Sequence, residues 1–97
     1  MKYSEAINEA PVVLVEFFAT WCPHCQKMMP IVAQVRELLG PDTPVIQLDI
    51  DQNSAAAQEN GVDGVPTFII YKNGREEWRH SGEIDGNDLL AKVQSFN

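Results

Sequence analysis

Residues 12–25 read VVLVEFFATWCPHC, an apolar run that leads into two cysteines three positions apart. Apart from Glu16, the residues of 12–18 are β-branched, aliphatic or aromatic, which is typical of a strand buried on both faces of a sheet. Apolar residues recur at helical spacing from Pro23 to Leu39, so a helix is predicted to follow, kinked at Pro30. The stretch therefore predicts a buried strand that leads into a long helix, with both cysteines at the junction.

The rest of the chain predicts further strands and shorter helices. We expect helices over Ser4–Ala10, over Ser54–Asn60 with Asn53 as its cap, and after Asp85, and strands over Val45–Ile50, Thr67–Lys72 and Arg75–Ser81. A helical crossover makes the first two strands parallel, and Asn73-Gly74 is a strong hairpin signal between the last two. The predicted fold class is α/β: a mixed sheet of about four strands flanked by helices on both faces, in a single domain over residues 1–97.

Composition and charge exclude several classes of partner. The 97 residues carry a net charge of −7, with seven Lys and Arg in all, which argues against nucleic acid and anionic membranes as partners. No apolar run approaches the roughly 20 residues that span a bilayer. The N-terminal residues form no apolar signal core, so we expect a cytoplasmic protein.

The two cysteines suit thiol–disulfide chemistry. The attacking species is a thiolate, and a helix N-terminus favours that anion through its unpaired N–H groups. Cys22 falls at this terminus, with Pro23 suited to the first helical position. Cys25 lies one turn further along, where it could attack a mixed disulfide formed by Cys22. His24 between them can add a positive charge or a hydrogen bond that favours the Cys22 thiolate.

Two other interpretations of the cysteine pair are open. A CxxC segment is also half of a zinc site, but structural zinc takes four protein ligands. The candidates reach four only if His24 and His80 are both included, and His80 lies on a distant strand, so we expect no metal. The cysteines could also be inert and buried, although the start of a helix is an activating position.

Four motifs in order resemble the thioredoxin family over nearly the whole chain. They are the active-site block at residues 17–30, the strand-to-helix segment at 49–53, the cis-proline loop at 61–67 and the hairpin at 71–74. The resemblance implies the thioredoxin fold and a cofactor-free protein-disulfide reductase. Its partners would be thioredoxin reductase or a similar electron donor, and disulfide-bearing client proteins. A monomer is expected, since no exposed apolar stripe beyond the active-site rim can be identified.

The resemblance also implies a binding groove. The Val65–Pro66 bond would be cis and packed against the cysteines, with the Val65 backbone exposed to an extended substrate strand. Trp21, Pro23, Val65 and Gly82 would border a shallow apolar groove. Alternatively, Pro66 is an ordinary loop proline and Trp21 a core aromatic residue.

Glu16 stands where the family has a buried aspartate that exchanges a proton with the second cysteine. The resemblance implies the same role toward Cys25, and burial should raise the pKa of the Glu16 carboxyl. Gln47 replaces a lysine that often neighbours this acid, so the carboxyl should stay protonated more readily. The alternative is a glutamate turned to solvent. Arg36 is expected on a solvated helix face.

Pro23-His24 departs from the usual thioredoxin dipeptide and resembles that of periplasmic oxidants of the DsbA type. A more oxidising oxidase or isomerase on the same fold is therefore a second hypothesis. A non-catalytic binding module is a third, although the presence of both cysteines argues against it. Glu83 could place negative charge at the groove rim and disfavour acidic substrates; the alternative is a solvated loop charge.

Overall fold

The computed structural model describes residues 2–97, which contain a four-stranded mixed sheet in the order β2-β1-β3-β4. Strand β1 (Val12–Phe18) pairs in parallel with β2 (Val45–Asp49) and antiparallel with β3 (Thr67–Lys72). Strand β4 (Arg75–Ser81) continues antiparallel from β3. The mixed sheet predicted from the sequence is confirmed.

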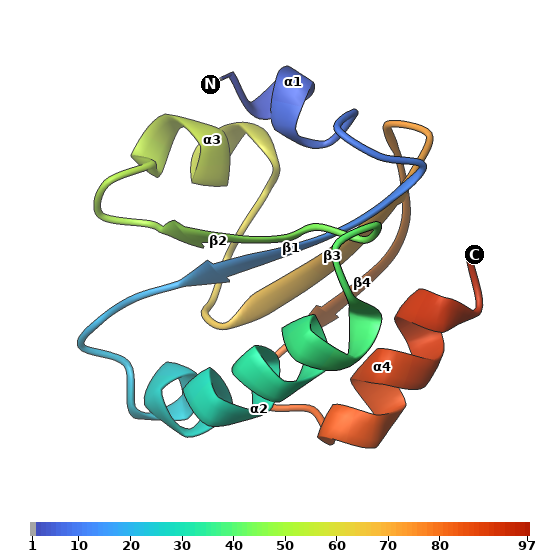
Figure 1. The fold of residues 1–97 in the computed structure, drawn as a ribbon. Coiled ribbons are helices and arrows are strands. Elements are labelled where there is room, and N and C mark those ends of the chain that lie inside the picture. The colour runs from blue at the N-terminus through green and yellow to red at the C-terminus, as the bar shows by residue number, and fades with distance from the viewer. Residues whose placement is uncertain (1) are drawn as a thin grey trace.

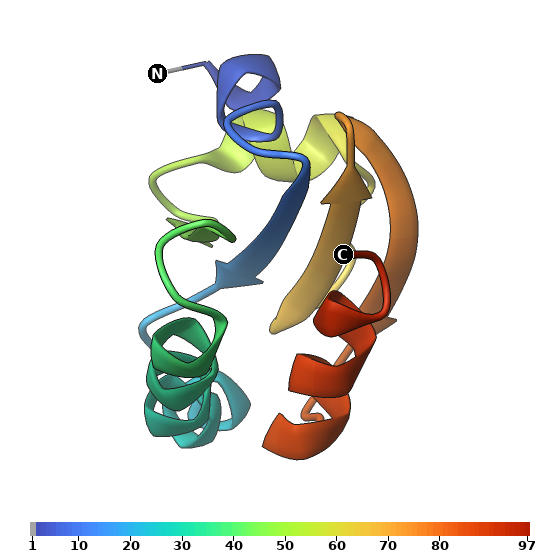
Figure 2. The ribbon, with the colours of Figure 1, turned by 45° about the vertical axis from the view of Figure 1, so that its right-hand side comes forward.

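Helices cover both faces of this sheet (Figure 1). Helices α2 (Pro23–Leu39) and α4 (Gly86–Gln94) lie on one face, and α1 (Tyr3–Ala6) and α3 (Ser54–Glu59) lie on the other. The turned view in Figure 2 shows the same three layers. The two faces of the sheet therefore have separate apolar cores.

Strand β1 contributes to both cores because its side chains alternate between the faces. Leu14 packs with α2 and α4, whereas Val13, Val15 and Phe17 pack with α3 and the residues around α1. Glu16 shares the parity of Leu14 and therefore belongs to the α2 face. The one carboxylate of this strand is thus placed on the same side of the sheet as the helix that carries the cysteines.

The helical prediction at the N-terminus is wrong in extent. Helix α1 ends at Ala6, and residues up to Ala10 form turns. The side-chain amide of Asn8 donates to the carbonyl oxygen of Ser4 at 2.7 Å, and the Asn8 backbone N–H donates to Glu5. Asparagine competes in this way with the backbone bond that would continue a helix.

Other boundaries differ by small amounts. Strand β2 ends at Asp49 and α3 ends at Glu59, each one residue before the predicted end. Asn53 stands at the N-terminus of α3 but makes no side-chain cap; its amide instead donates to the Asp49 carbonyl oxygen at 3.0 Å. Helix α2 has its predicted bounds and continues through Pro30, and a kink there stays a prediction.

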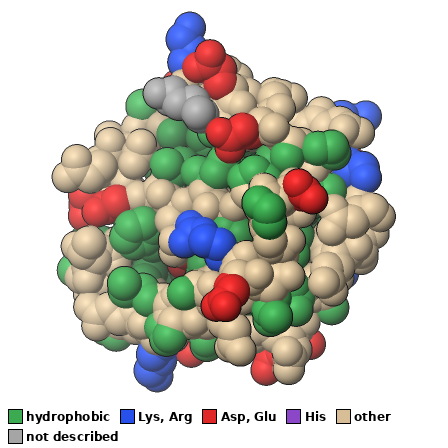
Figure 3. Space-filling view, viewed as in Figure 1, with side chains coloured by type: hydrophobic (Ala, Val, Ile, Leu, Met, Phe, Trp, Pro, Cys, Tyr) green, Lys and Arg blue, Asp and Glu red, His purple; other side chains and the backbone are tan. Residues whose placement is uncertain are grey.

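The surface seen in Figure 3 shows hydrophobic side chains over β2 and α2, interspersed with acidic and basic ones. Within residues 2–97, the helices are all too short or too polar to cross a bilayer.

The packing of α4 provides a matched stability test. Leu89 is fully buried between α4 and the sheet, whereas Leu38 on α2 is 58% exposed. Leu89→Ala should lower the free energy of unfolding by about 2–5 kcal/mol through lost burial and a cavity. Leu38→Ala should change it by no more than about 0.5 kcal/mol. Urea unfolding followed by tryptophan fluorescence measures both, and equal losses would contradict this placement of α4.

Candidate active site

Cys22 is the N-cap residue of α2, with extended backbone angles and Pro23 as the first helical residue. The backbone N–H of Cys25 donates to the Cys22 sulfur at 3.3 Å. Both cysteines are buried and carry free thiols. An N–H group of the first turn of α2 therefore points at the first sulfur, as the position of the CxxC segment predicted.

Cys25 has a different electrostatic environment. Burial, and next the neighbouring Cys22 side chain, raise the pKa of the Cys25 thiol to about 12. Cys25 therefore stays protonated near neutral pH and needs a base before its sulfur can attack. The charge of Glu16 also raises the Cys25 pKa, so the two groups interact.

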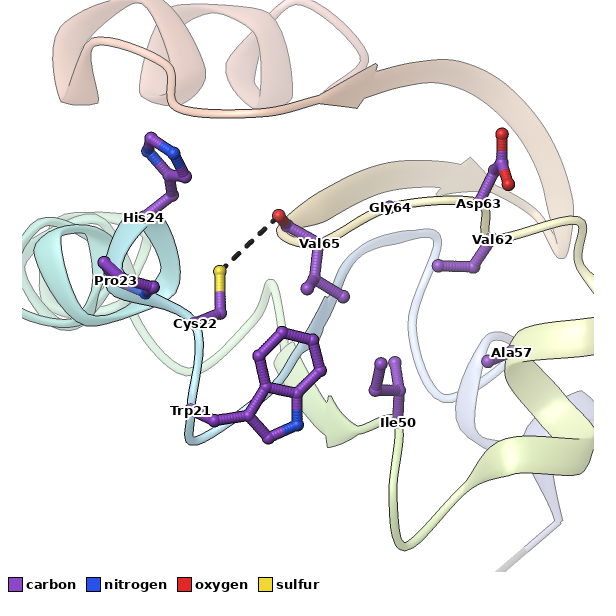
Figure 4. A pocket seen from close by; sticks show the side chains of 10 residues that line it. All are labelled: Trp21, Cys22, Pro23, His24, Ile50, Ala57, Val62, Asp63, Gly64 and Val65. Carbon is purple, nitrogen blue, oxygen red and sulfur yellow. Dashed lines mark hydrogen bonds between the residues drawn. The ribbon is translucent and has the colours of Figure 1, made fainter.

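A shallow groove of about 450 Å³ opens beside the Cys22 sulfur (Figure 4). Trp21, Pro23 and Val65, three of the predicted rim residues, line it. Trp21 is 63% exposed, so the alternative of a core aromatic is wrong. Its indole N–H donates to the Asp51 carboxylate at 3.0 Å, which holds the ring at the rim.

Gly82 does not line this groove, contrary to the prediction. Its N–H donates to the Pro66 carbonyl oxygen at 2.8 Å, next to the cis Val65–Pro66 bond. From Val65 the groove extends toward Ile50 and Val62 (Figure 4). Pro66 itself is buried and lies behind the lining rather than in it.

The Val65 backbone faces the cysteine directly. The Cys22 thiol donates to the Val65 carbonyl oxygen at a sulfur–oxygen distance of 3.6 Å, drawn as the dashed line in Figure 4. A polar backbone group thus borders a mostly apolar groove at the sulfur. Such a group can pair with the backbone of an extended peptide.

Glu16 is 2% exposed, so the alternative of a solvent-turned glutamate is wrong. Its Oε1 accepts a hydrogen bond from the side-chain amide of Gln47 at 2.9 Å. Burial raises the pKa of the Glu16 carboxyl, and the Gln47 hydrogen bond and the charge of Arg36 lower it in part. The predicted direction of the shift is therefore correct.

Arg36 is not on a purely solvated face. Its guanidinium donates to the Val45 carbonyl oxygen at 2.7 Å and to Gln47 Oε1 at 3.0 Å. Gln47 does replace the lysine that often neighbours this acid in the family, but the charge of Arg36 still acts on Glu16. An arginine from α2 reaches across to β2, and this reach depends on a long flexible side chain that helical periodicity cannot reveal.

His24 turns away from Cys22 toward the segment that follows β4. Its Nδ1 lies 2.5 Å from Glu83 Oε2, and this contact lowers the pKa of the Glu83 carboxyl. Across residues 2–97 no hydrogen bond joins His24 to Cys22. Glu83 is therefore part of the site's rim, and it compensates the charge that a protonated His24 would bring.

The sequence analysis missed several residues of the groove. Ile50, Val62 and Asp63 line it, and Asp51 holds Trp21. Two of these, Ile50 and Asp51, lie in the 49–53 segment and two, Val62 and Asp63, in the 61–67 loop. The motifs therefore marked the right segments without showing which side chains face the sulfur.

Comparison with known proteins agrees with this geometry. The family model described as Thioredoxin matches residues 1–95. The chain belongs to the thioredoxin family. It is 36% identical to a thioredoxin-like protein of Synechocystis, covering 98% of this chain and 91% of that one. A mutant thioredoxin of Halobacterium salinarum has a similar structure, with a TM-score of 0.87, 32% identity, and 96% and 80% of the two chains covered.

Thioredoxin Y, chloroplastic, of rice is 40% identical over 91% of this chain but only 52% of its own length. The chain spans about half the length of this and two further curated relatives. The part of the chain from residue 2 to 97 brings together no group of three or more His, Cys, Asp or Glu that could hold a metal ion.

The raised pKa of Glu16 predicts a pH-dependent stability. The ordinary pKa of the Glu16 carboxyl is 4.5, and its pKa in the folded state is higher. Between these two pKa values the folded protein therefore binds more protons than the unfolded chain. The contribution of Glu16 to stability should therefore fall as pH rises above 4.5. Urea unfolding of wild type and Glu16→Gln from about pH 4 to about pH 8 should show the variant gaining relative stability with pH. A difference that does not change with pH would contradict the burial of this carboxyl.

Proposed function

We propose that this chain is a protein thiol–disulfide oxidoreductase of the thioredoxin type that reduces disulfides through Cys22 and Cys25. One observation carries the proposal: the Cys22 sulfur lies at the N-terminus of α2, beside an apolar groove, with Cys25 one turn behind it. Membership of the thioredoxin family, whose members are thiol–disulfide oxidoreductases, supports the same reaction. We propose that residues 1–97 act as one such domain.

The first step uses Cys22 as nucleophile. Its thiolate attacks one sulfur of the substrate disulfide, so a Cys22–substrate disulfide forms, the substrate S–S bond breaks and the second substrate sulfur leaves as a thiolate. The Cys25 N–H, together with the positive end of the α2 dipole, stabilises the attacking anion. His24 is assigned to the electrostatics of this step, and Glu83 moderates its effect.

The second step uses Cys25. Glu16, as carboxylate, takes the Cys25 proton, and the Cys25 sulfur attacks the Cys22 sulfur. The bond from Cys22 to the substrate breaks, the substrate leaves reduced, and a Cys22–Cys25 disulfide remains. Both electrons that reduce the substrate come from the dithiol, which an electron donor must then restore.

The groove supplies substrate binding. Trp21, Pro23 and Val65 offer apolar contacts, and the Val65 backbone can pair with an extended client segment. Asp63 at the groove and Glu83 at the rim bring negative charge, which disfavours acidic segments. Unfolded or extended segments around a disulfide, neutral or basic in charge, suit this surface.

Thioredoxins in general act with reductases and disulfide-bearing targets. For this chain we propose a thioredoxin reductase or similar donor, a monomeric state and a cytoplasmic location. A dithiol that serves as a reductant is best kept reduced in a compartment with a reducing thiol pool. The net charge of −7 supports protein clients rather than nucleic acid or anionic membranes.

The Pro23-His24 dipeptide also suggests the reverse reaction, in which the Cys22–Cys25 disulfide oxidises a dithiol substrate. A protonated His24 near Cys22 would favour the thiolate and make the pair more oxidising, as in an oxidase or isomerase. The contact between His24 and Glu83 opposes that effect, since the carboxylate compensates the imidazolium charge. It therefore favours the reducing role over the oxidising one.

Cysteine variants separate catalysis from mere binding. With insulin as substrate and dithiothreitol as electron source, Cys22→Ser should fall to the uncatalysed rate because the nucleophile is gone. Cys25→Ser should form the Cys22–substrate disulfide but release it slowly, so that a mixed disulfide accumulates and is seen by mass. Wild-type activity in Cys22→Ser would overturn the proposal, and an inactive wild type that still binds clients would favour the binding-module hypothesis.

A further inference from the structure

A chain of hydrogen bonds runs from the surface of α2 to the buried carboxyl of β1. The Arg36 guanidinium donates to Gln47 Oε1 at 3.0 Å, and Gln47 Nε2 donates to Glu16 Oε1 at 2.9 Å. A second bond from Arg36 to the Val45 carbonyl oxygen anchors the guanidinium to β2 at 2.7 Å. Gln47 and Glu16 are cross-strand partners in the parallel pair, so their spacing is set by the sheet.

The chemistry of these groups fixes the direction of every bond. A guanidinium can only donate, so the carbonyl oxygen of the Gln47 amide must face Arg36. The amide nitrogen must then face Glu16, where it too can only donate. Glu16 Oε1 is therefore an acceptor in both protonation states. When the carboxyl is neutral, its proton is favoured on Oε2, because the unprotonated oxygen of a carboxyl is the better acceptor for the Gln47 amide.

The other groups around this carboxyl leave it few alternatives. Within residues 2–97, the charged and titratable groups that act on it are Arg36 and Cys25, both on α2. Strand β3 presents Phe68 opposite Glu16, and α4 contributes Leu89 and Val93 to the same core. Among residues 2–97, Gln47 is the one side chain that donates a hydrogen bond to the carboxyl, and it orients the group.

An amide between cation and carboxylate has a different effect from a direct ion pair. A cation in contact with a buried carboxylate would hold it charged in the resting protein. The Gln47 amide donates one hydrogen bond to the carboxyl and separates it from the Arg36 guanidinium. The carboxyl can thus take and return a proton, with one oxygen reserved for that task.

We propose that Arg36 and Gln47 are positioning residues for Glu16, which keep Oε2 as its proton-carrying oxygen and thereby set the rate and pH dependence of proton exchange with Cys25. The proposal rests on the proposed function, because it concerns the second step of that reaction. It assigns a task to Arg36, a residue that the family resemblance does not mark.

A single-turnover reaction with a coloured aromatic disulfide tests the proposal. Attack by Cys22 releases the first aromatic thiol, and attack by Cys25 releases the second, so the two steps give two phases. Gln47→Leu removes the amide donor, and should slow the second phase about tenfold at neutral pH while leaving the first phase unchanged. The rate of the second phase should fall on the acid side of its pH profile, its acid limb, as Glu16 becomes protonated. In Gln47→Leu this acid limb should move to higher pH, because Glu16 loses the Gln47 hydrogen bond that lowers its pKa.

Arg36→Gln should give a smaller change in the same direction. The two effects should be less than additive in the double variant, because Arg36 acts on Glu16 partly through Gln47 and partly through its own charge. Gln47→Lys, which places an ammonium group beside Glu16, should move the acid limb to lower pH. The matched control is Lys92→Gln, which removes the same charge from an exposed position on α4 and should change neither phase.

The outcomes separate this proposal from the proposed function. If wild type shows a second phase and both Gln47→Leu and Arg36→Gln leave its rate and acid limb unchanged, the positioning role is overturned. The proposed reaction would then still stand. Additive effects in the double variant would overturn the link through Gln47. Absence of the second phase in wild type would overturn the reaction itself. If Gln47→Leu does not fold, Arg36→Gln and Gln47→Lys decide by their acid limbs.

Discussion

The hydrogen bond from the Cys25 N–H to the Cys22 sulfur depends on how tightly β1 is joined to α2. Strand β1 ends at Phe18 and α2 begins at Pro23, so only residues 19–22 connect them. A strand buried on both faces cannot shift without exposing Val13, Leu14, Val15 and Phe17. The sheet therefore fixes where the helix begins, and the helix N-terminus fixes the environment of the first sulfur.

The same burial that makes β1 rigid means that placing the Glu16 carboxyl there costs free energy of folding. A carboxyl in an apolar strand is a local conflict between sequence pattern and environment, and such conflicts are expected at functional positions. Here the cost is limited because Gln47 satisfies one oxygen and Arg36 reaches the amide from outside. The protein thus holds a proton acceptor behind Cys25, whose thiol has a pKa raised to about 12 and needs one.

Much of this architecture could be predicted from local sequence. The apolar run of β1, the periodicity of α2 and the Asn73-Gly74 turn each depend on neighbours in the chain, and all three are found where expected. Asn73 and Gly74 both have positive φ, as a tight hairpin requires. The spacing of the cysteines likewise sufficed to place them at the start of the helix.

Features that depend on reach or on the third dimension could not be predicted in this way. Arg36 on α2 finds its partners on β2, and Gly82 donates to Pro66 and does not line the groove. The Asn8 and Asn53 amides find carbonyl oxygens where periodicity predicted helix or cap. For Arg36, Asn8 and Asn53, a long or polar side chain has several possible partners within reach, and the sequence does not rank them.

The most direct measurement is the equilibrium of the Cys22–Cys25 pair against graded glutathione buffers, with the thiols alkylated and counted by mass. A dithiol built to reduce, with His24 held by Glu83, should show one two-electron transition with a midpoint nearer the thioredoxin value of about −270 mV than the DsbA value of about −120 mV. A midpoint close to about −120 mV would instead identify an oxidant. The absence of any two-electron transition would contradict the redox role of these cysteines altogether.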